Sequence, residues 1–155
     1  MVGILQTTKT LTMATTDSIK QIMKELDSHS PLLPSRPNGF VLSLLGISTY
    51  LVTADRIVMP SEEEFVRSFL RDTFGRHVEQ EYYPLFQQMV ARFKQEPRER
   101  LAPKVRYCCK YIAGSMPPEE IPLVIKYLDQ LALADASSSA DEWAAVEELT
   151  AWIQK

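Results

Sequence analysis

The chain has 155 residues, of which 45% are hydrophobic and 24% charged, and its net charge is −3. A chain of this length can bury most of its apolar surface around one core, so the composition excludes a wholly disordered chain and removes the need for disulfides or metals as staples. The negative net charge argues against a dedicated nucleic-acid-binding protein, and we expect no DNA partner.

The cysteines and the apolar segments indicate the compartment. Cys108 and Cys109 are neighbours in the sequence, and adjacent cysteines bridge each other only with a strained backbone. No basic cluster followed by an apolar run opens the chain, and the longest apolar stretch, 40–54, is too short for a bilayer of about 30 Å. We therefore expect a cytoplasmic protein without a transmembrane segment.

Residues 1–37 differ in pattern from the rest of the chain. The first sixteen residues are polar and predict a loose arm. Apolar residues at i, i+3, i+4 and i+7 then predict a short amphipathic helix over 17–28: Ile19, Ile22, Met23 and Leu26. Prolines recur at every third position after it, Pro31, Pro34 and Pro37. This spacing favours an extended connector, which serves either as a stiff spacer or as a docking peptide for an aromatic groove.

The following region, 38–155, shows helical spacing of apolar residues throughout. The stretch 40–54 is apolar nearly all round, as expected for a central helix. Ser61 and Glu64 have capping-box spacing and predict a helix over 61–74. Further helices are predicted at about 77–93, with His77 at the start, and at about 101–112, 121–134 and 143–153. No strand pattern appears, so we predict an all-α fold, a single compact bundle of six or seven helices.

An internal repeat is the most informative motif. The sequence Leu-Val-Thr-Ala-Asp ends one apolar helix at Asp55, and Leu-Ala-Leu-Ala-Asp ends another at Asp135. Seven positions after each aspartate a glutamate, Glu62 or Glu142, falls in the first turn of the next helix. Ser139 and Glu142 also have capping-box spacing. The two copies predict two equivalent acidic corners in one helical body.

This pattern resembles the TerB and DjlA-like family of bacterial helical domains, in which an apolar helix is followed by Ala-Asp-Gly, a short loop with one buried aliphatic, and a Glu-rich helix start. The resemblance covers about residues 40 to 154, and Val58 matches the buried aliphatic of the first copy. The glycine is replaced by Arg56 in the first copy and Ala136 in the second. The second loop has serines at 137–139 where the aliphatic is expected.

The resemblance implies a compact TerB-like bundle with pseudo-twofold character, linked to tellurite resistance and stress. It also implies a non-enzymatic binding module with a protein partner. The acidic loops would hold a divalent cation such as calcium through Asp55, Glu62, Asp135 and Glu142. Calcium takes about six to eight oxygen ligands, so backbone carbonyls and water would complete the shell. A metal-free explanation also fits, because glutamate is favourable near a helix N-terminus and aspartate caps turns.

A basic stretch suggests an alternative function. After a predicted break at Glu96 and Pro97, the basic helix of the stretch 92–110 carries a patch of Arg98, Arg100, Lys104, Arg106 and Lys110. Tyr107 and Tyr111 alternate with these charges, so the helix could bind an acidic protein, lipid headgroups or RNA as an anion-binding adaptor. The simpler interpretation is a solvated face, because Glu96 and Glu99 interrupt the positive charge.

Catalysis finds little support, so an uncharacterised enzyme is the third alternative. His29 and His77 lack a recognisable nucleophile or metal partner nearby in the sequence. Arg106 and Lys110 would lower the pKa of the cysteine pair, but helical spacing places at least one of Cys108 and Cys109 in the core. The sequence leaves a homo-oligomer open.

Overall fold

The computed structural model describes residues 39–134 and 139–154, and this part of the chain is a bundle of six α-helices and one short 3-10 helix, with no strand. The predicted all-α fold is confirmed. The arm, the helix at 17–28, the proline connector and Asp135 lie outside the described residues. The helices are α2 (Gly39–Val52), α3 (Pro60–Phe74), α4 (Arg76–Phe93), α5 (Arg98–Ser115), η1 (Pro118–Glu120), α6 (Ile121–Leu133) and α7 (Ala140–Gln154).

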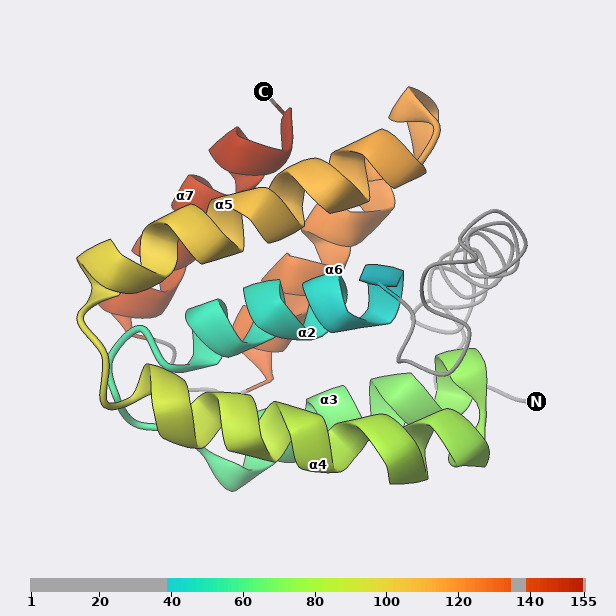
Figure 1. Ribbon diagram of the computed structural model, residues 1–155, viewed down its shortest axis with the longest axis horizontal. Coiled ribbons are helices and arrows are strands. Elements are labelled where there is room, and N and C mark those ends of the chain that lie inside the picture. Colours follow the sequence, from blue (N-terminus) through green and yellow to red (C-terminus); the bar gives the residue numbers. More distant parts are fainter. Residues whose placement is uncertain (1–38, 135–138, 155) are drawn as a thin grey trace.

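The helices form two layers. In Figure 1, α2 runs between α5 and α4, and α7, α6 and α3 lie behind them. Helix α2 is the centre of the bundle, because Phe40, Leu44 and Leu51 are fully buried and nearly every other residue of the helix is also covered. Each such side chain contributes about 1.5–3 kcal/mol by its burial, so the helix that is apolar all round becomes the common core element. The prediction of a central helix here is confirmed.

Helix α2 and Thr53, the residue that follows it, bury hydroxyl groups that all have hydrogen-bond partners. Ser48, Thr49 and Thr53 each donate a hydrogen bond to the carbonyl one turn earlier, at 2.6 to 2.7 Å. The Ser48 hydroxyl also contacts the Tyr127 hydroxyl at 2.7 Å, which ties α2 to α6. Although α2 is strongly apolar, it has only 14 residues, and among the described helices none is both long and apolar enough to cross a membrane.

Two helix starts differ from prediction. Helix α3 begins at Pro60, and its capping bond runs from the Met59 N–H to Glu62 Oε1 at 2.9 Å, so the capping box predicted for Ser61 and Glu64 is wrong. Proline fits the first helical position because its missing N–H would have no partner there. Helix α4 begins at Arg76, one residue before His77, which was expected at a helix start.

Candidate functional site: a buried glutamate pair

The two glutamates of the repeat occupy the same position in their helices. Glu62 is the third residue of α3 and Glu142 the third residue of α7. Their exposed fractions are 0% and 2%. A glutamate in a first helical turn is usually solvated, and carboxylates are rarely this buried unless they are paired with another group. The sequence predicts both residues at helix starts, but their burial depends on how α3 and α7 pack in the bundle.

Each carboxyl group is held by the backbone three residues earlier. The Met59 N–H donates to Oε1 of Glu62, and the Ser139 backbone hydrogen-bonds the Glu142 carboxyl. The Ser139 hydroxyl accepts the Glu142 N–H at 3.1 Å, which confirms the capping interaction predicted for this corner. The other oxygens, Oε2 of Glu62 and Oε1 of Glu142, are fully buried, and no N–H or O–H group of the described residues reaches Glu142 Oε1.

The Glu62 carboxyl is the group that acts most directly on Glu142. The pKa of Glu142 is raised from 4.5 to about 8; burial is the largest cause, followed by a hydrogen bond with Glu62 and the negative charges of Glu62 and Asp55. The Ser139 backbone bond opposes the shift. A hydrogen bond between two carboxyl groups needs a proton between them, because two carboxylates in one site cannot both ionise without strong repulsion. At neutral pH the pair therefore holds a proton.

The first acidic corner turns at Asp55 and Arg56. Asp55 Oδ1 accepts the Ile57 N–H at 3.0 Å. Arg56 has φ 65°, the left-handed conformation that favours glycine. This conformation costs a residue with a side chain about 1–2 kcal/mol. The Arg56 guanidinium donates to the carbonyls of Lys94 and Glu96, the latter at 3.2 Å, so the loop is anchored where α4 ends.

Arg56 thus adopts the turn geometry that a glycine would supply, and it adds a contact that glycine cannot make. Val58, the aliphatic expected to be buried in this loop, packs half-buried against the core. Ala136, the corresponding replacement in the second corner, lies outside the described residues.

The described acidic residues fit a cation site in part. Glu62 and Glu142 face each other, and Asp55 acts on Glu142 through its charge. Within 39–134 and 139–154, no three histidine, cysteine, aspartate or glutamate side chains converge as a metal-binding group. Two glutamates offer up to about four oxygens, and an all-oxygen donor set suits calcium or magnesium. The remaining ligands would have to come from Asp135, backbone carbonyls or water.

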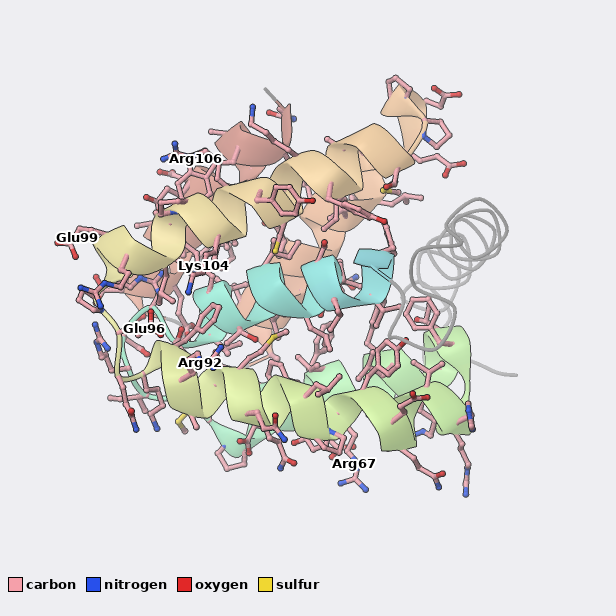
Figure 2. All side chains as sticks on the ribbon, viewed as in Figure 1. Arg67, Arg92, Glu96, Glu99, Lys104 and Arg106 are labelled. Atoms are coloured by element: carbon pink, nitrogen blue, oxygen red, sulfur yellow. The ribbon has the colours of Figure 1, made fainter. Side chains whose placement is uncertain are left out.

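The residues of the predicted basic patch differ in their surroundings. Arg98 stacks at 3.7 Å over the Tyr50 ring and donates to Thr53 Oγ1 at 3.3 Å, so it is a partly buried packing residue. Arg106 lies 5.1 Å from the centre of the Trp152 ring on α7. Figure 2 shows Lys104 on the opposite edge of α5 from Arg106.

The remaining basic residues, Arg100 and Lys110, are exposed. The stretch 92–110 is not one helix, because α4 ends at Phe93 and α5 begins at Arg98. The basic residues of α5 are therefore shared between its two edges. They include one, Arg98, whose charge already lies against an aromatic ring.

The histidine and cysteine side chains form no catalytic group in the described residues. His77 is highly exposed, and its Nε2 lies 3.8 Å from Glu81 on the same helix. Cys109 is in the core, as predicted for at least one of the pair, and burial raises its pKa to about 12. Burial also raises the pKa of Cys108, so the lowered pKa expected for the cysteine pair is wrong. His29 lies outside the described residues.

Sequence reasoning missed one feature of the site, the direct contact between Glu62 and Glu142. The equal spacing of the two repeats carried the signal, because it puts a glutamate at the third position of each helix. No family model, curated protein or solved structure matches the chain. The resemblance to TerB-like domains therefore depends on the residues of the two corners alone.

Proposed function

We propose that the chain is a non-enzymatic TerB-like helical interaction module in which the two acidic corners bind a divalent cation such as calcium. The observation that carries this proposal is the buried pair of Glu62 and Glu142 at the starts of α3 and α7. Asp55 and, by the repeat, Asp135 would add negative charge and ligands from the preceding loops.

The negative charge of the buried Glu62 and Glu142 pair has to be neutralised. Removing one carboxylate from water costs several kcal/mol, and two facing carboxylates add their mutual repulsion. A shared proton relieves this repulsion at low and neutral pH. A divalent cation would relieve it more completely, and it would displace the proton because metal ligands must be deprotonated.

The burial of the pair also favours a binding module over an enzyme. A catalytic carboxylate must reach a substrate, whereas Glu62 and Glu142 are covered by the bundle. An ion between them would join α3 to α7 and thereby hold the two halves of the molecule together. Such a role suits a domain that presents a rigid surface to a protein partner. The resemblance to TerB-like domains is also the basis on which we propose a role for the chain in stress or tellurite resistance.

Thermal unfolding with added cations tests the proposal. We would compare calcium, magnesium, zinc and a chelator at a pH above the Glu142 pKa of about 8, where no proton competes. A specific ion should stabilise the fold by RT ln(1 + [L]/Kd), which is about 2.7 kcal/mol at one hundred times Kd. Glu62→Gln and Glu142→Gln should abolish this gain, and Asp55→Ala and Asp135→Ala should reduce it.

Glu147→Gln is the matched control, because Glu147 is an exposed glutamate on the same helix as Glu142. It should keep the full response to the cation. Unchanged unfolding of the native chain at millimolar concentrations of every ion would refute cation binding. An equal response in the Glu142→Gln and Glu147→Gln variants would place any bound ion elsewhere.

A further inference from the structure

A groove lies between α4 and α5, with α2 as its floor. Its volume is about 380 Å³. The walls are largely apolar, with Leu42, Met89 and Phe93 half-buried along it and Tyr107 68% exposed at the rim. An apolar groove between helices is the usual receptor for an amphipathic helix.

Small residues of α2 make the floor of this groove. A Cβ added to Gly39 would lie 2.6 Å from the Tyr111 hydroxyl oxygen, and one added to Gly46 would lie 3.0 Å from Cys108 Sγ. The absence of side chains at these positions lets α5 approach α2 closely. Cys108 therefore sits in the groove, half-buried, and is held by a hydrogen bond with Ser43.

The charge of the groove is one-sided. No acidic residue lines it, whereas Arg92 and Lys104 both do and both are exposed. Figure 2 shows Arg92 on α4 and Lys104 on α5, on either side of the C-terminal half of α2. The groove thus combines an apolar floor with a positive charge on each rim at the end away from Gly39.

We propose that this groove binds residues 17–28 of the same chain as an amphipathic helix. This segment has one apolar stripe, Ile19, Ile22, Met23 and Leu26, at helical spacing. A helix of about 12 residues is marginal in water on its own, so it needs a surface against which to bury that stripe. The groove is the apolar surface at which the described part of the chain begins, because Gly39 lines it.

Charge and chain length give the direction of binding. On a helical wheel, Glu25 and Asp27 flank the stripe on its two sides near the end of the segment. This arrangement matches Arg92 and Lys104 on the two rims, so the segment would run parallel to α2. The connector 29–38 spans up to about 30 Å at 3.1 Å per residue, which exceeds the length of α2, about 21 Å.

The rate of Cys108 alkylation in the full chain tests the proposal, because Cys109 is fully buried and reacts slowly. The short connector gives the tethered segment an effective concentration of the order of millimolar. If the free segment binds with a Kd of about 100 μM, the covered groove outnumbers the open groove by roughly ten to one. Ile22→Asp should therefore raise the Cys108 rate about tenfold. Gln21→Asp is the control, because it adds the same charge on the opposite face of the segment.

Two further measurements keep the test independent of the single variant. A synthetic peptide of residues 17–28 should slow the alkylation of the Ile22→Asp chain again. Replacing both Arg92 and Lys104 with glutamate should raise the alkylation rate of Cys108. Adding Glu25→Lys and Asp27→Lys to that variant should lower the rate again. Equal rates for the Ile22→Asp and Gln21→Asp chains would overturn the proposal. Protection that increases with chain concentration would also overturn it, because it would show a second copy as the occupant.

Discussion

The two acidic corners hold equivalent glutamate side chains, Glu62 and Glu142, through different local contacts. In the first corner Met59 precedes α3, and its side chain has no oxygen with which to cap the helix, so the backbone bond to Glu62 is the capping contact. In the second corner the Ser139 hydroxyl caps α7 in addition to its backbone bond with Glu142. The first loop is anchored by Arg56 at the end of α4.

Despite these different contacts, the two corners share one feature. The caps and anchors vary, yet in each corner a glutamate is the third helical residue and is buried. Capping alone does not explain this burial, because a capping glutamate functions equally well when it is exposed to water. The contact of the two carboxyls across the bundle is therefore the feature that unites the corners, and it is the one that we associate with function.

The anchor of the first corner should give the largest change in stability. Arg56→Ala removes two hydrogen bonds to carbonyls while keeping a side chain at positive φ, so we expect a loss of about 2 kcal/mol. Arg56→Gly loses the same bonds but removes the strain, and it should be about 1 kcal/mol less destabilising. Urea unfolding measures both. Equal losses in the two variants would contradict the strained turn.

The pH dependence of the glutamate pair should give a smaller effect. The pKa of Glu142 in the folded chain is about 8, against 4.5 as its ordinary value, so the folded state holds this proton more tightly. The resulting stability is fully present below pH 4.5 and is lost as the pH rises through about 8. In chelator, Glu142→Gln should match the native chain at low pH and become more stable than the native chain above the Glu142 pKa.

Chemical unfolding of both chains across this pH range measures the difference. Glu147→Gln should follow the native chain at every pH, because Glu147 is exposed. A constant offset between the native and Glu142→Gln chains would show that Glu142 does not carry the raised pKa.

Much of the fold could be predicted because the apolar side chains of the bundle recur at helical spacing. Helix α2 is the clearest case, since only a helix covered on all sides tolerates an apolar sequence all round. The start of α4 at Arg76 lies one residue before His77, which was expected at a helix start. The capping box of α3 was misassigned because Ser61 and Glu64 fit the motif, whereas Pro60 sets the helix start one residue earlier.

The candidate site could be predicted only in part. Spacing located Glu62 and Glu142, because both follow an Ala-Asp corner by the same interval. Their contact depends on how α3 and α7 pack, and no local pattern encodes that packing. The surroundings of the basic residues of α5 could not be predicted from their closeness in sequence. Their helical positions instead direct Arg106 toward Trp152 and Lys104 toward the groove.

The number of protons released when calcium binds tests the central claim most directly. Titration of the native chain with calcium at neutral pH, in buffers of different ionisation enthalpy, measures this number. Because the Glu62 and Glu142 pair holds a proton below a pKa of about 8, we predict the release of about one proton per ion and an affinity that rises roughly tenfold per pH unit up to that pKa. Calcium binding without proton release, or with an affinity independent of pH, would contradict the account.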